Sequence, residues 1–293
     1  MLYLRRFTFP SAEDESGFFI RSGKAKRTCY DSFYPFGILS ARGLTELVFE
    51  PVTILYGGNG SGKTTALNVM ADKLSLTRAT LCNSSAFMAD YLALCDAEHG
   101  SIPLRSRIIT SDDVFDYMLN LRQLNEGVSI RREEMFEEYT SAKRSNDFRL
   151  RSMEDYEELR RINQARSMTQ SRYVRSRLVG EVREHSNGES AMQYFAGNIS
   201  DDSLYLLDEP ENSLSPEKQQ ELLRFLEESA RFFGCQFVIA THSPFLLSMR
   251  GAKVYDLDAE PAAVRRWTEL GAVRAYYDFF MAHRREFQSG EDE

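Results

Sequence analysis

The sequence lacks the signals that mark secreted and membrane-spanning proteins. Its four cysteines are scattered, with no Cys-x-x-Cys pair and no histidine at metal-ligand spacing, so they predict free or buried thiols of a reducing compartment. No apolar run approaches the roughly eighteen residues that a membrane helix needs. Residues 1–10 carry charges where a signal peptide has its apolar core. Together these absences predict a soluble, cytoplasmic protein without a membrane segment.

Basic residues are outnumbered by acidic ones. The chain has 36 Lys and Arg against 44 Asp and Glu, which gives a net charge of −8. This acidity argues against indiscriminate binding to nucleic acid or anionic membranes, although it leaves room for a local basic patch. With 42% hydrophobic and 27% charged residues, the 293-residue chain does not have the composition of a disordered, collagenous or coiled-coil protein. It has room for one large α/β domain or two small ones.

Short apolar runs that alternate with helical patterns predict an α/β fold. Strands are predicted at residues 2–9, 47–49, 52–56, 107–110, 203–207, 236–241 and 253–257, and helices at 66–76, 112–124 and 216–233. Residues 10–33 are polar and interrupted by proline and glycine, which predicts a loop or a hairpin insertion. Because strands alternate with helices, we expect a mainly parallel central sheet covered on both faces.

Residues 130–185 differ in character from the segments around them. Charges of both signs fill a helical pattern that contains no proline and a single glycine. This predicts a helical subdomain inserted between strands. We therefore expect a single domain, residues 1–293, with three subdivisions: residues 1–80 with a small N-terminal antiparallel β region, residues 111–196 as the helical subdomain, and residues 197–293.

A glycine-rich stretch fits the pattern G-x-x-x-x-G-K-[ST], directly after a predicted strand and directly before a predicted helix. Glycines let backbone N–H groups approach phosphate oxygens without a Cβ in the way, and the following helix adds its positive end. The pattern predicts that Lys63 reaches the β- and γ-phosphates of ATP and that Thr64 ligates Mg²⁺. The alternative is a glycine-rich turn with an incidental lysine. The predicted nucleotide-binding residues are Gly57, Gly58, Asn59, Gly60, Ser61, Gly62, Lys63, Thr64 and Thr65.

Two consecutive carboxylates, Asp208 and Glu209, follow the buried strand predicted at 203–207. In a parallel sheet the carboxyl end of such a strand faces the glycine-rich loop, where ligands bind. Asp208 is predicted to hold the Mg²⁺ shell, and Glu209 to act as the general base that polarises the attacking water. The alternative is an ordinary acidic turn, which Pro210 would also suit.

The segments Asp208-Glu-Pro-Glu-Asn-Ser-Leu-Ser-Pro216 and Ala240-Thr-His242-Ser-Pro244 resemble the head domain of ABC-type ATPases. The resemblance implies a P-loop NTPase fold, a Walker B strand with a catalytic glutamate at Glu209, and a D-loop at 212–215. It puts His242 where that family has its switch histidine, whose imidazole can donate a hydrogen bond to the γ-phosphate or to the attacking water. The alternative for His242 is a histidine that caps a turn. Lys63, Glu209 and His242 are thus the predicted catalytic residues.

The signature motif of that family, Leu-Ser-Gly-Gly-Gln, has a degenerate match at residues 185–189, His-Ser-Asn-Gly-Glu. Gly188 precedes Asp208 by 20 residues, about the separation that such heads use. The resemblance implies that Ser186 and the Gly188 N–H contact the γ-phosphate of ATP held by a second subunit, in a head-to-tail homodimer with two ATPs at its interface. The alternative is that Ser186 and Asn187 cap the helix that follows.

The order of Tyr34-Pro-Phe36, the glycine-rich loop and the two later motifs is similar to that of small stand-alone ATPases of bacteria, which lack transmembrane partners and long coiled coils. The resemblance covers residues 1–80 and 185–285, and not the segment between 85 and 180. Tyr34 or Phe36 either stacks on adenine or packs in the core. Ser111 and Asp112 stand where the family has its Q-loop glutamine.

Six arginines and no carboxylate lie between Arg160 and Arg177, and Tyr173 is interleaved among them. Such a stretch is a candidate contact for nucleic acid or for an acidic partner. Two alternatives are a solvated helix face paired with the acidic residues at 154–158, and arginines that line the dimer interface.

These patterns predict a Mg²⁺-dependent ATP hydrolase that acts as a soluble, ATP-driven dimerising switch or motor for an unidentified partner protein, in a DNA-related or defence context. One alternative is the nucleotide-binding subunit of a membrane transporter, which a full signature and a Q-loop glutamine would favour. The other is an ATP-sensing module that does not hydrolyse, against which the Asp208–Glu209 pair argues.

Overall fold

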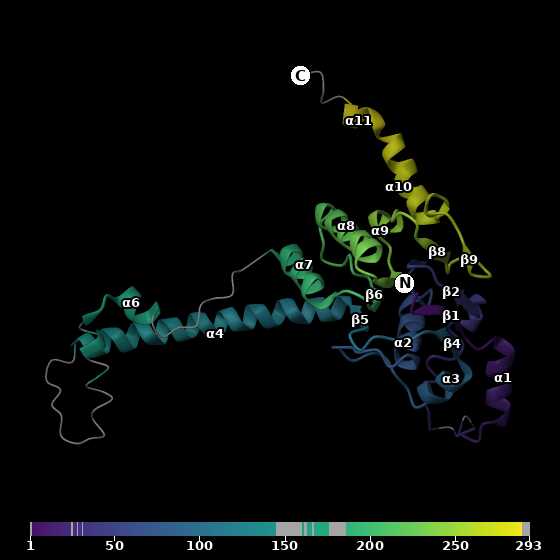
Figure 1. Cartoon of the computed structure of the whole chain (residues 1–293), viewed down its shortest axis with the longest axis horizontal. Coiled ribbons are helices and arrows are strands. Elements are labelled where there is room, and N and C mark those ends of the chain that lie inside the picture. Colours follow the sequence, from purple (N-terminus) through teal and green to yellow (C-terminus); the bar gives the residue numbers. More distant parts are fainter. Residues whose placement is uncertain are drawn as a thin grey trace. The chain divides into compact units, whose positions relative to one another are not determined.

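A computed structural model gives the fold of the chain and describes residues 2–24, 26–27, 29–30, 32–144, 160, 163–165, 167–175 and 186–288 (Figure 1). The chain divides into two compact units. The larger unit comprises Met1–Val114 and Asn187–Glu293, and the smaller comprises Phe115–Ser186.

The larger unit is built on a six-stranded sheet with the order β5-β6-β7-β3-β8-β9. The first five strands are mutually parallel, and β9 runs antiparallel to β8. Every residue of β3, β6 and β7 is buried, as continuous apolar runs predict for a parallel sheet covered on both faces. The bounds are Val52–Tyr56 (β3), Arg107–Thr110 (β5), Leu204–Asp208 (β6), Gln236–Ala240 (β7), Lys253–Asp256 (β8) and Ala263–Val264 (β9). The predicted fold class is confirmed.

A second, three-stranded antiparallel sheet has the order β2-β1-β4, with bounds Leu4–Thr8 (β1), Glu46–Val48 (β2) and Asp96–His99 (β4). Gln236, the fully buried first residue of β7, ties this sheet to the larger one. Its side-chain oxygen accepts from the N–H groups of Tyr3 and Leu4 at 2.8 and 2.9 Å, and its nitrogen donates to the Leu4 carbonyl at 2.7 Å. The predicted N-terminal antiparallel region is therefore present and anchored to the parallel sheet.

Helices α2 and α8 begin where the sequence provides helix-starting residues. α8 (Pro216–Phe232) starts with proline at its first position, and the Ser215 hydroxyl accepts from the Lys218 N–H. α2 (Lys63–Lys73) follows the glycine-rich loop directly, and its apolar side chains belong to the main core. The other helices of this unit are Met88–Leu94 (α3), Asn187–Asn198 (α7), Pro244–Leu247 (α9), Gly271–Ala282 (α10) and Arg284–Gln288 (α11), with 3-10 turns at Ser40–Arg42 and Trp267–Glu269. Within the described part of the chain, no helix has both the length and the apolar character needed to cross a bilayer.

The prediction of a loop or hairpin at residues 10–33 is wrong for its first half, which forms helix α1 (Ala12–Arg21). Ser11 and Asp14 form a capping box, with the Ser11 N–H donating to the Asp14 carboxylate at 2.9 Å and the Asp14 N–H donating to the Ser11 hydroxyl at 3.2 Å. Pro10 precedes this box. The proline therefore marks the start of a helix and not a break in one.

Helix α4 (Ser111–Arg144) is much longer than the helix predicted at residues 112–124. It begins with a capping box, in which the Thr110 N–H donates to the Asp113 carboxylate at 2.7 Å and the Asp113 N–H donates to Thr110 Oγ1 at 3.3 Å. It joins the helix predicted at residues 112–124 to the start of the helical pattern predicted from residue 130, without a break between them.

The smaller unit has its own apolar cluster. Tyr139 of α4 and Tyr173 of α6 (Gln170–Arg175) are both buried in it, with ring centroids 5.5 Å apart. The Tyr139 hydroxyl also donates to the Met168 carbonyl at 3.1 Å. The helical character predicted for this segment is present in its described residues.

Candidate active site

The glycine-rich loop joins β3 to α2 and has the tight backbone that its sequence predicts. Gly62 is the N-cap of α2 and has a left-handed φ of 94°. A Cβ at Gly62 would lie 2.9 Å from Leu39 Cδ2, and a Cβ at Gly57 would lie 2.5 Å from Ser61 Oγ. Both positions therefore require glycine, the first also for its backbone conformation. Of the remaining predicted loop residues, Asn59 and Gly60 are exposed, and Thr65 is buried in the first turn of α2.

Lys63 is folded back onto this loop. Its amine donates to the carbonyls of Gly57 and Gly58 at 2.7 and 3.1 Å, and the residue is only 4% exposed. Burial lowers the pKa of the Lys63 amine, whereas the nearby carboxylates of Glu209 and Asp208 act to raise it. An ammonium held among loop carbonyls and carboxylates is placed to exchange the carbonyls for phosphate oxygens.

Asp208, the last residue of β6, stands beside this lysine at the carboxyl edge of the sheet. Burial raises the pKa of its carboxyl to about 6, and a hydrogen bond from the Thr64 hydroxyl partly offsets that rise. Among the described residues, Asp208 Oδ1 is buried and has no hydrogen-bond partner. A buried carboxylate oxygen without a partner, next to a threonine hydroxyl, fits a divalent cation such as Mg²⁺, which takes one or two protein oxygens and keeps waters.

No cluster of three or more His, Cys, Asp or Glu side chains arranged as a metal site occurs in the described ranges. At Asp208 and Thr64, Mg²⁺ would rely on phosphate and water oxygens for most of its coordination.

Glu209 and His242 face one another across the ends of β6 and β7. Glu209 Oε1 lies 3.2 Å from His242 Nε2, and Asn212 Nδ2 donates to Glu209 Oε2 at 3.0 Å. Glu209 adopts a left-handed φ of 47°, which is uncommon outside glycine, and its N–H donates to the Ala240 carbonyl at 2.9 Å. Both side chains remain partly open to solvent. A carboxylate held in this way is suited to accept a proton from a water molecule.

Glu211 was not singled out from the sequence, yet it holds the turn that carries His242. Its Oε1 accepts from the His242 N–H at 2.7 Å and from the Ser243 N–H at 3.1 Å. The Ser243 hydroxyl in turn donates to Gln219 Oε1 of α8 at 2.7 Å. Glu211 is the third acidic residue of the Asp-Glu-Pro-Glu run that begins at Asp208. Its closeness to Asp208 and Glu209 in the sequence was the signal that could have identified it.

Asp258 is a second residue that the motifs did not reveal. It lies two residues beyond β8, and both of its carboxylate oxygens accept from the Gly58 N–H, at 3.0 and 2.8 Å. The parallel pairing of β3 with β8 aligns Tyr56 with Asp256 and so brings Asp258 to the loop. In the sequence, Asp258 is recognisable only as an acidic residue just after a predicted strand. That this strand, β8, lies next to β3 and its glycine-rich loop is known only from the strand order.

Gly188 lies in the first turn of α7, which starts at Asn187. A Cβ at Gly188 would lie 3.1 Å from Lys218 Cγ of α8 and 4.0 Å from Leu214 Cδ2 in the D-loop segment. Ser186 immediately precedes the helix. His185, the first residue of the degenerate signature, lies outside the described residues.

The structure shows where the two aromatic residues that the sequence left open, Tyr34 and Phe36, lie. Phe36 is 7% exposed and stacks on Phe18, with ring centroids 4.9 Å apart, so it packs in the core. Tyr34 packs against the same core and is only partly buried.

Of the arginine stretch, Arg160, Arg172 and Arg175 are described, whereas Arg161, Arg166 and Arg177 lie outside the described residues.

Residues 105–248 match a family model described as "AAA domain, putative AbiEii toxin, Type IV TA system". The match spans the segment from the strand before α4 to the turn after His242. Among curated proteins, none matches this sequence.

Three solved structures illustrate the likeness of this chain to known folds. The first is a transporter described as of the metal-chelate ABC type, in an inward-facing conformation (18% identity, 78% of each chain covered, TM-score 0.36). The second is a dimeric ATP-binding cassette in a post-hydrolysis state with ADP and Pi (12% identity, 72% of this chain and 84% of that chain, TM-score 0.32). The third is the Smc head domain of Pyrococcus furiosus bound to the C-terminal domain of ScpA (10% identity, 80% and 94%, TM-score 0.39). Likenesses this distant do not bear on the activity of this chain.

Proposed function

We propose that the chain is an ABC/AAA-like P-loop ATPase, that it hydrolyses ATP with Mg²⁺ and that Glu209 is the general base. One observation carries this proposal: Glu209 lies 3.2 Å from His242 and directly follows the buried Asp208, at the same sheet edge as Lys63. A site that only sensed ATP would need the lysine and the loop, but not a second carboxylate held towards a histidine.

The proposed reaction is in-line transfer of the γ-phosphoryl group to water. Lys63 leaves the carbonyls of Gly57 and Gly58 and binds β- and γ-phosphate oxygens, which concentrates positive charge where the transition state is most negative. The water oxygen bonds to the γ-phosphorus as the bond to the β–γ bridging oxygen breaks, and Glu209 takes the proton that the water loses. His242 orients Glu209 and donates a hydrogen bond towards the γ-phosphate.

Thr64 and Asp208 are the residues proposed to hold Mg²⁺. Held there, the cation would supply positive charge that offsets the charge of the phosphates. The orphaned Asp208 Oδ1 supports this assignment, since a bound cation would offset the cost of ionising a buried carboxyl whose pKa is raised.

We further propose that two copies close head to tail on ATP, with Ser186 and the Gly188 N–H of each copy contacting the γ-phosphate held by the other. The position of Gly188, in the first turn of a 12-residue helix and beside the D-loop residue Leu214, supports this role. Closing with ATP and opening after hydrolysis would gate a partner protein. The toxin–antitoxin description of the matching family model makes a defence context part of the proposal.

Glu209→Gln tests the proposed base. The amide keeps the shape and the hydrogen bonds but cannot take a proton, so ATP should stay bound while turnover falls by about a hundredfold or more. With Mg²⁺ and ATP this variant should sediment as a stable dimer, whereas Glu228→Gln, an exposed acid of α8, should behave as the wild type. If Glu209→Gln hydrolysed ATP at the wild-type rate, a residue other than Glu209 would be the general base.

Gly188→Asp tests the contact across the dimer. A carboxylate there should repel the ATP held by the neighbouring copy, so each chain still binds ATP through Lys63 while dimerisation and hydrolysis fail. Gly188→Ala is the matched control, because its close contact is with the flexible Lys218 side chain, at 3.1 Å, while Leu214 Cδ2 lies at an ordinary 4.0 Å.

Mixing Gly188→Asp chains with Lys63→Ala chains sharpens that test. The mixed dimer has one composite site with both defects and one with neither, so partial activity should return. If Gly188→Asp alone kept full activity and full dimerisation, residues 185–189 would only cap a helix and would not contact ATP.

A further inference from the structure

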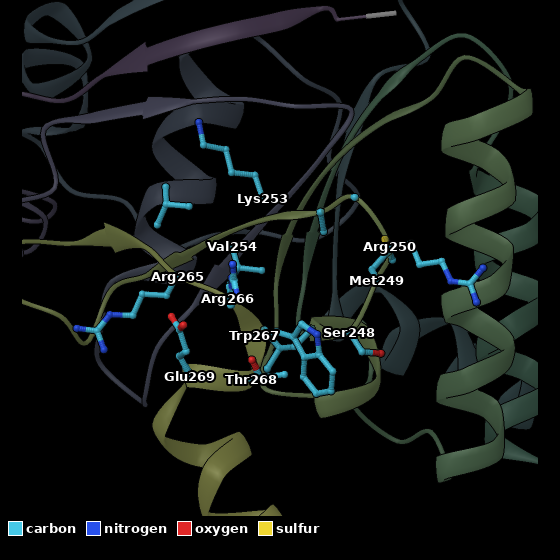
Figure 2. A pocket seen from close by; sticks show the side chains of 14 residues that line it. Ser248, Met249, Arg250, Lys253, Val254, Arg265, Arg266, Trp267, Thr268 and Glu269 are labelled. Carbon is cyan, nitrogen blue, oxygen red and sulfur yellow. The ribbon is translucent and has the colours of Figure 1, made fainter.

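A second cavity lies at the opposite edge of the parallel sheet from the ATP site. It has a volume of about 900 Å³ and is lined by two chain segments, Leu247–Val254 and Val264–Glu269 (Figure 2). The first segment leads into the amino end of β8, and the second pairs with it, since the Arg265 N–H donates to the Val254 carbonyl at 3.0 Å. The glycine-rich loop follows the carboxyl end of β3, so the two sites are separated by the length of the strands.

The cavity gathers positive charge on a chain that is acidic overall. Its lining holds four cationic residues, Arg250, Lys253, Arg265 and Arg266, and one acidic residue, Glu269, while the whole chain carries −8. Lys253 donates to the Val48 carbonyl at 2.8 Å, and Arg265 approaches Asp256 at 3.5 Å.

The other two cations are free to bind. The guanidinium groups of Arg250 and Arg266 have no ion-pair partner among the described residues, and both side chains are exposed. Because unpaired guanidinium groups bind phosphate through paired N–H donors, they make this cavity a candidate anion site.

Trp267, the only tryptophan of the chain, stands in the same cavity. It is 37% exposed, and Figure 2 shows its ring beside the side chains of Ser248 and Thr268. A half-exposed indole next to hydroxyl groups and unpaired guanidinium groups offers a stacking face for a flat base together with donors for phosphate. A purely anionic ligand would use the cations and leave the indole without a function.

The cations are spread out and do not converge on one point. Figure 2 shows Arg250 and Arg265 reaching to opposite sides of the cavity, with Trp267 and Arg266 between them. A compact anion can contact one of these groups, whereas a chain of evenly spaced phosphates can contact several in succession. At about 900 Å³ the cavity is at the upper end of the range for single small ligands, which also favours a short stretch of polymer.

We propose that this cavity binds single-stranded nucleic acid, with one base stacked on Trp267 and the flanking phosphates held by Arg250 and Arg266. Duplex DNA is disfavoured because its bases are not available to stack on a side chain. The site does not depend on ATP hydrolysis. It is also distinct from the arginine stretch at Arg160–Arg177, which is part of the smaller unit.

The single tryptophan supplies a direct measurement. Because Trp267 is the only indole, its fluorescence excited at the red edge reports on this cavity alone. Titration of the full chain with a 12-nucleotide single strand should give saturable quenching. The same duplex sequence, a nucleoside monophosphate and an oligoglutamate peptide should give little or none at equal concentration.

Each comparison ligand has a defined meaning. Equal quenching by the nucleoside monophosphate would assign the cavity to free nucleotides, and equal quenching by oligoglutamate would assign it to acidic peptides. Either result, or the absence of quenching by the single strand, overturns the proposal.

Variants test the named side chains with a fluorescently labelled strand. Trp267→Ala should weaken binding about tenfold, while Trp267→Phe, which keeps a ring, should stay within about threefold of the wild type. The Arg250→Ala, Arg266→Ala double variant should reduce the slope of log affinity against log salt by about 1.4, since each single-strand phosphate contact contributes about 0.7. Arg224→Ala, an exposed arginine of α8, is the matched control.

A second double variant separates the two candidate locations. Arg172→Ala with Arg175→Ala should leave the quenching of Trp267 intact. If those changes abolish it while Arg250→Ala with Arg266→Ala does not, the strand is held by the arginine stretch and the proposal fails. Thermal melting of each variant establishes that loss of binding is not loss of folding.

Discussion

The two edges of the parallel sheet carry opposite chemistry. At the carboxyl edge, Asp208, Glu209, Glu211 and Asp258 surround one buried ammonium, that of Lys63. At the amino edge of β8, four cations face one carboxylate around an exposed indole. At the first edge Lys63 and Asp208 are buried and the local charge is negative, whereas the second edge is open and positive.

The difference in charge between the two edges implies two different modes of phosphate binding. An acidic edge does not attract a triphosphate unless a metal cation and backbone N–H groups offset the repulsion, so the proposed binding of ATP there would depend on Lys63, the loop and Mg²⁺ together. A basic edge attracts a polyanion without a metal but does not position it for chemistry. The acidic edge is thus suited to reaction and the basic edge to binding.

Lys63→Ala should have the largest effect at the acidic edge. It leaves four carboxylates with no cation among them, so ATP affinity should fall by about a hundredfold or more. Calorimetry with Mg²⁺ and ATP measures this, with Lys73→Ala, at the other end of the same helix, as the control. Undiminished affinity in Lys63→Ala would contradict the placement of ATP at this edge.

Asp208→Asn should stabilise the metal-free protein at neutral pH. The pKa of the Asp208 carboxyl is raised to about 6 from 3.8, so the folded state favours the protonated form. The stability from that form is fully present below pH 4 and is lost as pH rises through 6, at a cost of about 2–3 kcal/mol.

Urea unfolding in a chelator should therefore show Asp208→Asn to be more stable than the wild type at pH 7.5, with a difference that shrinks towards pH 4.5. Mg²⁺ with ATP should reverse the order, because the charged carboxylate binds the cation more strongly than the neutral amide does. If the difference in unfolding free energy between the two proteins did not change with pH, ionisation of Asp208 would not be what destabilises the wild type.

Glu211→Ala should have a smaller and more specific effect. It removes the acceptor for two N–H groups in the turn that carries His242, so turnover should fall about tenfold while ATP affinity stays within about threefold. Glu211→Gln keeps one acceptor oxygen and should lie between. Separate measurement of kcat and of ATP affinity distinguishes this from a general loss of stability, with Glu221→Ala, an exposed acid of α8, as the control. Equal losses in both quantities would show that Glu211 supports the whole site and not the turn.

The parts of the fold and site that the sequence predicted are those with strict local requirements. The glycine-rich loop has backbone positions that only glycine fits, such as Gly57 and Gly62, and its strand and helix follow from short-range patterns. Asp208 and Glu209 were placed because they end a continuous apolar run.

What the sequence did not predict depends on contacts between distant segments. Glu211 and Asp258 act through hydrogen bonds to backbone groups 31 and 200 residues away, which no local pattern encodes. Helix α1 was missed because Pro10 suggested a loop, although Ser11 and Asp14 formed a legible capping box. Phe36 stayed ambiguous until its packing on Phe18 was visible, since an aromatic residue near a nucleotide motif fits either role.

Release of inorganic phosphate from ATP by the purified chain tests the central claim most directly. Wild-type protein should release phosphate over many turnovers in a reaction that requires Mg²⁺, and Glu209→Gln should retain ATP but release almost none. Absence of release by the wild type under conditions where calorimetry detects bound Mg²⁺ and ATP, or equal release by Glu209→Gln, would contradict the account of this site.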